Sequence, residues 1–418
     1  MAAVRQRNWM LAHAAALAAV LMAGISCGSR AEDRPPSQKV AKPTDWPNWR
    51  GPDHNGISRE TGWNPKSGMN VLWRAKVGTG YSSFAVSKGR AYTMGNTKNK
   101  DTVWCFDAEN GKVLWSHTYA CPLEPNSHDG GAAATPTVDG DRVYTLSKRG
   151  HLFCFDAAGG EIKWAKTCPA RPPEWGFAGS VFVLDRMLIL NVGTAGMALD
   201  KTQNGRRIWI NGQGRGGYGT PVPYKANGRQ CVAFFVERSM VGLLAANGQK
   251  LWEYPWKTRY DVNAADAIVR GDKVFLSSGY KKGCALIQVG RGQPNRIWQS
   301  REMCNHFNSC VLIDGCLYGF DENLLKCIDF MTGGVRWSQG GLGKGALMAA
   351  DGKLIIMAEH GKLVIAEASP TAYKEIASKQ IFTGRTRCWT TPVLSGGRIY
   401  CRQTRDGGPV ACVDVKGE

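Results

Sequence analysis

The sequence predicts an all-β protein, an eight-bladed β-propeller built from four-stranded antiparallel blades. Three observations support this fold: a Trp that recurs every 39 to 49 residues, an Asp–Gly turn before the clearest copies of that Trp, and a second hairpin upstream of each copy. Two hairpins per repeat supply four strands, and this repeat length is typical of propeller blades. The recurrent tryptophans are Trp73, Trp115, Trp164, Trp209, Trp252, Trp298 and Trp337.

The clearest copies of the repeat are residues 104–115, 153–164 and 326–337, in which an Asp lies four residues before a Gly and the Trp four residues after it. The Asp carboxylate can accept hydrogen bonds from the backbone of a tight turn, and Gly can adopt the positive φ that the turn needs. A buried Trp can lock neighbouring blades together through its ring and its N–H group. The structural repeat residues are therefore Asp107, Gly111, Trp115, Asp156, Gly160, Trp164, Trp209, Trp252, Trp298, Asp329, Gly333 and Trp337.

The upstream hairpins give the number of blades. Alternating apolar residues around an Asp–Gly pair are a strong hairpin signal. Hairpins of this kind occur near positions 85, 137, 181, 222, 268, 311, 348 and 393, which makes eight. Residues 390–416 supply three strands, and residues 70–77 look like a fourth strand without a partner, so we expect the N-terminal strand to close the ring and protect both edges. Seven blades are the alternative, because the repeat between residues 222 and 252 is irregular.

Four segments follow from composition. Residues 1–31 are predicted to be a signal peptide, because two arginines precede an apolar run that is too short for a membrane span. Residues 32–44 contain almost no large apolar residue and are predicted to be a flexible linker. Residues 45–70 are expected to form an N-terminal extension that packs on the propeller, which itself spans residues 71–418.

The export signal predicts a location in the periplasm or on the periplasmic face of the outer membrane. Residues 24–27 form an imperfect lipobox, which makes Cys27 a candidate for lipidation, whereas Ser29 and Ala31 suit an ordinary signal peptidase. The formal net charge of +19 falls to about +16 if cleavage follows Ala31, because three arginines are lost. A basic chain suits an acidic partner such as an anionic glycan, although the cations are scattered over all repeats. Nucleic acid is not expected, because no basic run is interleaved with aromatic residues.

Fourteen cysteines in an exported chain would ordinarily indicate disulfides. Four of them occupy one repeat position, two residues before the turn Asp, and are expected to pack as small apolar residues. These four are Cys105, Cys154, Cys327 and Cys412. Cys121 and Cys168 form the candidate disulfide, since each precedes a Pro just past a Trp strand of neighbouring blades. Residues 304–316 hold three Cys and one His without a C-x-x-C pair, so no metal site is expected there.

The Asp, Gly and Trp pattern resembles the repeat of the pyrroloquinoline-quinone-type propeller family, over roughly residues 71–416. Residues 46–52 also resemble the opening motif of exported propellers in this family. The resemblance implies one of two functions. The catalytic members are dehydrogenases that use pyrroloquinoline quinone with calcium and carry adjacent cysteines, a pair that this sequence lacks. The other members include the non-catalytic propeller lipoprotein of the outer-membrane barrel-assembly machinery, which agrees with this chain in length, blade count and export.

The loops that lead into the first strand of each blade converge on one mouth of a propeller, and here they are polar and aromatic. We take them as the candidate binding site. The candidate residues are Ser82, Ser83, His128, Asp129, Trp175, Tyr218, Asn263, Asp266, His306, Asn308, Lys344, Arg387 and Trp389. For calcium, the family resemblance offers as ligands only Asp261, Asn263, Asp266 and Glu174.

The function predicted from the sequence is that of a non-catalytic scaffold or binding protein of the cell envelope, with envelope proteins as partners, for instance an outer-membrane assembly complex. No cofactor is expected, and contact with a membrane is expected only through a lipid anchor. The alternatives are a quinoprotein alcohol or sugar dehydrogenase with pyrroloquinoline quinone and calcium, and a propeller that binds an anionic glycan.

Overall fold

The computed structural model describes residues 44–416, except residues 67, 126–127 and 291. All of them belong to one compact unit, which spans residues 35–418. The predicted signal peptide, Cys27 and all of the predicted linker except Thr44 lie outside the described residues. Within the described part of the chain, no helix has both the length and the apolar character that a membrane crossing requires.

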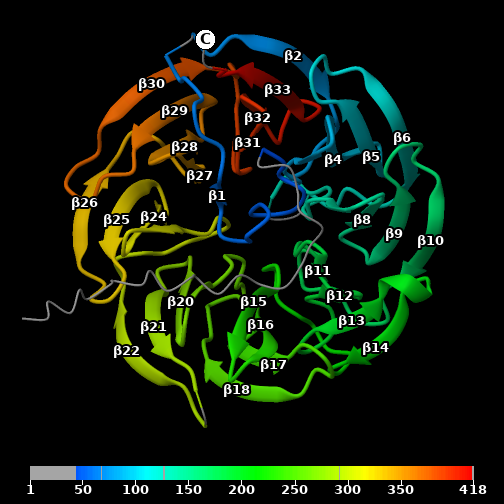
Figure 1. Ribbon diagram of the computed structural model, residues 1–418, viewed down its shortest axis with the longest axis vertical. Coiled ribbons are helices and arrows are strands. Elements are labelled where there is room, and N and C mark those ends of the chain that lie inside the picture. The colour runs from blue at the N-terminus through cyan, green and yellow to red at the C-terminus, as the bar shows by residue number, and fades with distance from the viewer. Residues whose placement is uncertain (1–43, 67, 126–127, 291, 417–418) are drawn as a thin grey trace, which may run out of the picture. The chain divides into compact units, whose positions relative to one another are not determined.

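Eight sheets follow one another around a ring (Figure 1). Seven of them have four strands, all antiparallel, and the eighth has a short fifth strand added from the N-terminal extension. The prediction of eight blades is therefore confirmed. The repeat that suggested seven blades forms a regular four-stranded sheet, because Asn227 and Gly228 both adopt the positive φ of a tight hairpin turn.

The strands of the first four blades run from the channel to the rim in chain order. Blade 1 contains β3 (Ala85–Ser87), β4 (Arg90–Thr97), β5 (Lys100–Asp107) and β6 (Val113–Ala120). Blade 2 contains β7 (Thr137–Asp139), β8 (Arg142–Leu146), β9 (His151–Asp156) and β10 (Ile162–Thr167). Blade 3 contains β11 (Phe182–Leu184), β12 (Met187–Leu190), β13 (Met197–Asp200), the short 3₁₀ helix η1 (Lys201–Gln203) and β14 (Arg206–Ile210). Blade 4 contains β15 (Val222–Ala226), β16 (Arg229–Phe235), β17 (Ser239–Leu244) and β18 (Lys250–Pro255).

The other four blades complete the ring. Blade 5 contains β19 (Ile268–Arg270), β20 (Lys273–Ser278), β21 (Gly283–Gln288) and β22 (Asn295–Ser300). Blade 6 contains β23 (Val311–Ile313), β24 (Cys316–Asp321), β25 (Leu324–Asp329) and β26 (Val335–Gln339). Blade 7 contains β27 (Ala346–Ala350), β28 (Lys353–Met357), β29 (Lys362–Glu367), β30 (Glu375–Gln380) and the added strand β1 (Ile57–Ser58). Blade 8 contains β31 (Val393–Ser395), β32 (Arg398–Arg402), β33 (Pro409–Asp414) and β2 (Val71–Lys76).

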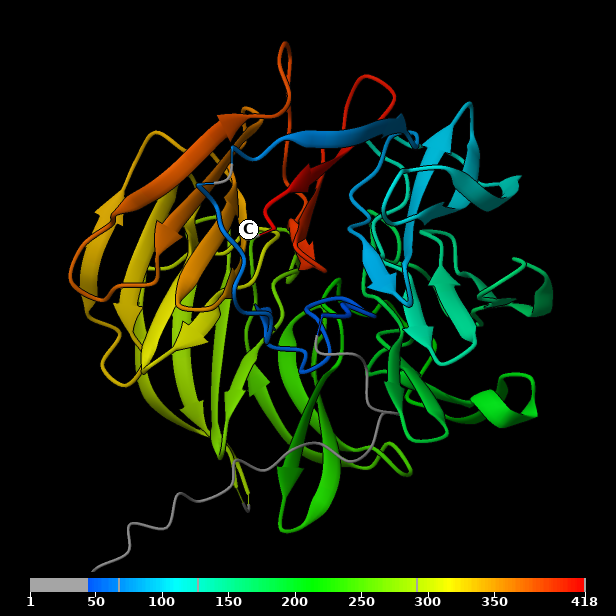
Figure 2. The ribbon, with the colours of Figure 1, turned by 45° about the horizontal axis from the view of Figure 1, so that its top comes forward.

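The ring closes through β2, the N-terminal strand, which pairs antiparallel with β33 from the C-terminal end. Figure 2 shows this blue strand lying beside the red strands of the C-terminal blade. Blade 8 is thus assembled from both ends of the described chain, and the predicted closure is confirmed. Because the two ends pair in one sheet, the facing edges of β2 and β33 are both hydrogen-bonded.

The repeat residues lock each blade to the next. Trp115 Nε1 donates to the carbonyl oxygen of Ala157 in blade 2 at 3.1 Å, and its ring lies flat on Gly160, where a Cβ would come within 2.6 Å of the ring. Trp73 makes the same contact with Gly111 of blade 1. In the turn itself, Asp156 accepts hydrogen bonds from the two amides that follow Ala157, at 3.0 and 2.9 Å. The turn therefore requires Gly for two reasons: its φ is positive, and the absence of a side chain leaves room for the Trp ring of the neighbouring blade.

Candidate functional site

A belt of hydrogen bonds lines the wall of the channel. Its members lie two residues before the first residue of each inner strand. At this position seven of the eight blades carry Ser, Thr or Asp. In five of these seven blades the side-chain oxygen accepts the amide N–H of the equivalent residue in the preceding blade. The bonds run from Ser83 to Thr135 (3.0 Å), Thr135 to Ser180 (2.9 Å), Ser180 to Thr220 (3.0 Å), Thr220 to Asp266 (2.7 Å) and Asp266 to Ser309 (2.8 Å).

Asp266 is the one member of this belt that has a second side-chain oxygen to offer, and that oxygen accepts a hydrogen bond from Trp49 Nε1 at 2.5 Å. Trp49 belongs to the N-terminal extension. The extension enters the ring through Trp46, whose backbone exchanges two hydrogen bonds of 2.8 Å with Val86 on the inner strand β3. Trp46 is 2% exposed and packs on Gly51, so this short segment is rigidly seated. Trp49 is thereby held across the channel as the floor of the mouth.

Arg50, the next residue, is buried beneath this floor. Its guanidinium donates to the carbonyl oxygens of Asn55 and Cys310, each at 2.8 Å. Burial lowers the pKa of Arg50, and the nearby Asp266 carboxylate opposes that effect. Burial likewise raises the pKa of Asp266, while Arg50 and the hydrogen bonds from Trp49 and Thr220 lower it. The floor is therefore a buried arrangement of opposite charges with every carboxylate oxygen occupied.

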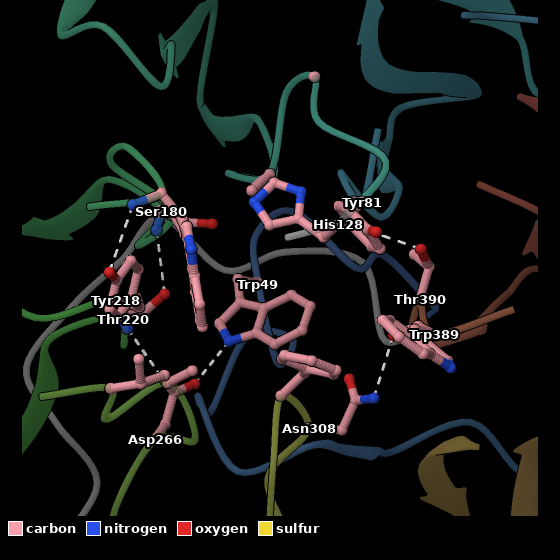
Figure 3. A pocket seen from close by; sticks show the side chains of 17 residues that line it. Trp49, Tyr81, His128, Ser180, Tyr218, Thr220, Asp266, Asn308, Trp389 and Thr390 are labelled. Atoms are coloured by element: carbon pink, nitrogen blue, oxygen red, sulfur yellow. Dashed lines mark hydrogen bonds between the residues drawn. The ribbon is translucent and has the colours of Figure 1, made fainter. Parts of the chain in front are cut away.

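Above the floor is a cavity of about 130 Å³ whose wall is largely aromatic (Figure 3). Seven rings from the extension and six different loops line it. They are Trp49, Tyr81, His128, Trp175, Tyr218, Phe307 and Trp389. The rings contact one another around the mouth, with centroid distances of 5.7 Å for Tyr81–His128, 5.9 Å for His128–Trp175, 5.7 Å for Trp175–Tyr218, 6.1 Å for Tyr81–Trp389 and 4.8 Å for Phe307–Trp389. We call these seven residues the aromatic cage.

Several polar atoms of the cage are engaged in hydrogen bonds within the protein. Tyr81 Oη donates to Asp129 at 3.2 Å, and Trp389 Nε1 donates to Glu359 at 3.0 Å. His128 Nδ1 accepts the amide of Gly130 at 2.8 Å, and burial lowers the pKa of His128, so its ring is neutral. Burial raises the pKa of Tyr81 and of Tyr218 to about 12. The cage therefore presents uncharged ring surfaces to the cavity.

A charged group lies behind the ring of Trp389. Lys344 contacts both Glu322, with Nζ 2.8 Å from Oε2, and His306 Nδ1, also at 2.8 Å. Arg387 pairs with Asp129 at 2.9 Å and lies 4.4 Å from the centroid of the Trp389 ring. Burial favours the protonated form of Glu322, but hydrogen bonds to His306 and Lys344 outweigh it and lower its pKa to about 2. These ion pairs position the rings of the cage and do not line the cavity.

A second pocket of about 310 Å³ adjoins the first and shares Trp175, Tyr218 and Val262 with it. Its remaining wall is polar. The exposed Tyr260 and the ion pair of Glu174 with Arg215, at 3.4 Å, lie at its edge. The mouth thus has an apolar part and a larger polar part.

The predicted site residues fall into three groups. Six line the cavity: His128, Trp175, Tyr218, Asp266, Asn308 and Trp389. Four lie behind the rings: Asp129, His306, Lys344 and Arg387. Three are buried in the wall and serve the backbone: Ser82, Ser83 and Asn263. Asn263 donates to the carbonyl oxygens of Val236, Glu237 and Trp256, so it is structural.

Sequence reasoning missed eleven of the 17 residues that line the cavity, and four of them show why. Tyr81 and Phe307 lie in loops that were identified as mouth loops, where only their polar neighbours were chosen. Thr220 belongs to the belt, whose period could have been read from the residue two before each inner strand. Trp49 had no signal, because nothing in the sequence says that the extension enters the channel.

The candidate disulfide between Cys121 and Cys168 is not formed, and both are free and buried. The two thiols lie in different surroundings, since Cys121 interacts with Asp101 and Ser147 whereas Cys168 packs among apolar side chains near Phe177. Burial raises the pKa of each thiol to about 12. Among the described residues, no three His, Cys, Asp or Glu side chains gather as a metal-binding group.

Comparison with known proteins identifies the family. The model of the family described as outer membrane protein assembly factor BamB matches residues 99–339, more than half of the chain. The chain belongs to this family of PQQ-like propellers. Comparison with curated proteins finds no match.

Solved structures agree with the fold. BamB from Moraxella catarrhalis is 13% identical, with a TM-score of 0.60 over 83% of this chain and 99% of that one. Quinohemoprotein alcohol dehydrogenase from Comamonas testosteroni is 13% identical, with a TM-score of 0.62 over 91% of this chain and 81% of that one. A europium-containing methanol dehydrogenase is 10% identical, with a TM-score of 0.54 over 89% and 98%. Likeness at this identity shows the propeller fold and carries no activity to this chain.

Proposed function

We propose that this protein is a non-catalytic binding propeller of the cell envelope, which holds a partner at the mouth that the aromatic cage forms. The observation that carries the proposal is the aromatic cage itself: the cavity is floored by Trp49 and walled by rings. Apolar pockets with a few placed polar groups are the usual form of a binding site. The family, whose described member is an assembly factor, supports a scaffold and a location in the periplasm or at the outer membrane.

The groups at the mouth argue against a dehydrogenase that uses pyrroloquinoline quinone with calcium. Calcium takes six to eight oxygen ligands, and most oxygens of the four residues proposed for it are engaged elsewhere. Asp261 Oδ2 is paired with Arg238, and Glu174 faces Arg215. Asn263 Oδ1 accepts a hydrogen bond from Ser278 Oγ at 2.7 Å, and both oxygens of Asp266 accept hydrogen bonds. The donor set therefore does not fit the metal.

The same lining argues against an anionic ligand, whether the tricarboxylate quinone or a charged glycan. No Lys or Arg is among the described residues that line the cavity. Lys344 and Arg387, which contact cage rings from outside the cavity, are already paired with Glu322 and Asp129. An anion in the cage would lose water without gaining a counter-charge, which is strongly unfavourable.

Site-specific photo-crosslinking in the envelope of the source cells tests this proposal. A crosslinker at Tyr260, which is 53% exposed beside the mouth, is expected to capture one discrete protein. A crosslinker at Leu72 on the outer strand β2, 45% exposed, is the matched control and is expected to capture none. Capture from Leu72 alone would contradict the proposal. So would dye-linked alcohol oxidation by the purified protein after addition of pyrroloquinoline quinone and calcium.

A further inference from the structure

The aromatic cage combines three properties that together specify a class of ligand. Seven rings line it, and a single carboxylate, Asp266, stands at its floor. No cationic side chain is among the described residues that line it. The inference that follows rests on the proposed function, because it names what the mouth holds.

The charged side chains that flank the cage are engaged with one another. Lys344 pairs with Glu322, and Asp129 pairs with both Arg387 and Arg405. Arg50 lies under the floor and is held by backbone carbonyl oxygens. A cation that enters the cavity therefore meets ring faces, while the Asp266 carboxylate at the floor already interacts with the Arg50 guanidinium.

The cage itself already attracts cations from within the protein. Lys344 Nζ lies 5.6 Å from the centroid of the Phe307 ring and 5.7 Å from that of Trp389, and Arg387 Cζ lies 4.4 Å from that of Trp389. An aromatic face carries negative potential, so a cation within about 6 Å of its centroid is attracted. The rings on the far side of the cage, Trp175 and Tyr218, have no such partner among the described cation–ring contacts.

Hydrogen bonding decides which kind of cation fits. A primary ammonium group has three N–H donors that lose water on entry. The cavity offers few acceptors in return, because both oxygens of Asp266 and the hydroxyls of Ser180 and Thr220 already accept backbone or indole N–H groups. A fully methylated ammonium group has no donors to lose. The cavity of about 130 Å³ is close to the roughly 150 Å³ that accommodates benzene elsewhere, and so is large enough for one such group.

We propose that the aromatic cage binds a quaternary ammonium group against its ring faces, with Trp49 as its floor.

Titration of the purified protein, followed by calorimetry and by quenching of Trp fluorescence, tests this proposal. The probes are choline, tetramethylammonium, ethanolamine and 3,3-dimethylbutan-1-ol, which has the shape of choline without its charge. Choline and tetramethylammonium are expected to bind about tenfold or more tightly than the neutral isostere and than ethanolamine, because only these two combine a positive charge with methyl groups. Equal or tighter binding of the isostere would overturn the proposal, and so would the absence of choline binding.

Variants locate the binding. Trp175→Ala is expected to weaken choline binding about tenfold, and Trp175→Phe, which keeps a ring, by less. Leu114→Ala on the outer strand β6 is the control and is expected to leave choline affinity unchanged. Unfolding midpoints measured in parallel show whether each variant is folded; a folded Trp175→Ala protein with undiminished affinity would refute the assignment.

An experiment with lipid vesicles distinguishes two sources of the ammonium group, a lipid and a free solute. Sedimentation with phosphatidylcholine vesicles, but not with phosphatidylglycerol vesicles, would place the ammonium group on a lipid, whereas binding of choline without vesicle binding places it on a free solute; both support the cage. The crosslinking experiment at Tyr260 is independent of these titrations. Capture of a partner without choline binding overturns the ligand and leaves the proposed function standing.

Discussion

Substitution of Gly51 by Ala is the sharpest test of how the extension is seated. Gly51 has φ +75°, a conformation that costs an Ala about 1 kcal/mol. A Cβ at this position would lie 2.6 to 2.8 Å from three carbon atoms of the Trp46 ring. Trp46 is 2% exposed, so its ring is surrounded by protein, and its backbone is paired with Val86. Overpacking of a core typically adds about 1–3 kcal/mol. We expect Gly51→Ala to lower the free energy of unfolding by about 2–4 kcal/mol.

Gly89→Ala is the matched control. Gly89 has φ +74° in the hairpin between β3 and β4, and nothing lies within 4 Å of the position that a Cβ would take. It should therefore show the cost of backbone conformation alone, about 1 kcal/mol. Urea unfolding of both variants under one set of conditions gives the difference directly. Equal destabilisation by the two substitutions would refute the claim that Trp46 is rigidly seated.

Three further predictions concern the charged group, the belt and the thiols. The pKa of Glu322 is lowered from about 4.5 to about 2. The stability that its bonds to His306 and Lys344 contribute is therefore present above about pH 4.5 and is lost as the pH falls towards 2. The destabilisation caused by Glu322→Gln, measured by urea unfolding, should become smaller over that range. Thr135→Val leaves the buried amide of Ser83 without its acceptor and should cost about 1–3 kcal/mol in urea unfolding. The 13 described cysteines should resist alkylation in the native protein and react in urea, because all are buried.

Each of these has a result that would contradict it. A Glu322→Gln penalty that stays constant between pH 4.5 and 2 would mean that the carboxylate is not ionised in the way its partners suggest. An unaffected Thr135→Val protein would show that the belt contributes no stability at that blade. Rapid alkylation of native protein would show that at least one described thiol is accessible, and peptide mapping would identify it.

The blade repeat could be predicted because its information is local. Asp156, Gly160 and Trp164 lie within nine residues, and each has a duty set by the turn between two adjacent strands. Hairpin signals of this kind do not depend on the rest of the molecule. The closure of the ring was also predictable, because the N-terminal end has a strand without a partner and the C-terminal sheet lacks its fourth strand.

The location of the site was predicted from the sequence, but the roles of its individual residues were not. The mouth loops were found because every inner strand is preceded by one, yet Ser83 and Asn263, chosen as polar candidates, serve the wall of the channel. Polar type alone cannot distinguish a side chain that faces a cavity from one that satisfies buried backbone. The apolar rings of Tyr81 and Phe307, in the same loops, line the cavity instead.

The sequence by itself determined an eight-bladed propeller with a mouth formed by aromatic and polar loops, because repeats and turns are encoded over a few residues. Only the tertiary structure decided that the mouth has a floor. That floor depends on a hydrogen bond between Trp49 and Asp266, which are 217 residues apart, and on the seating of the extension against inner strands of several blades. Contacts between residues so far apart produce no repeating pattern in a single sequence, because they form only once the ring has closed.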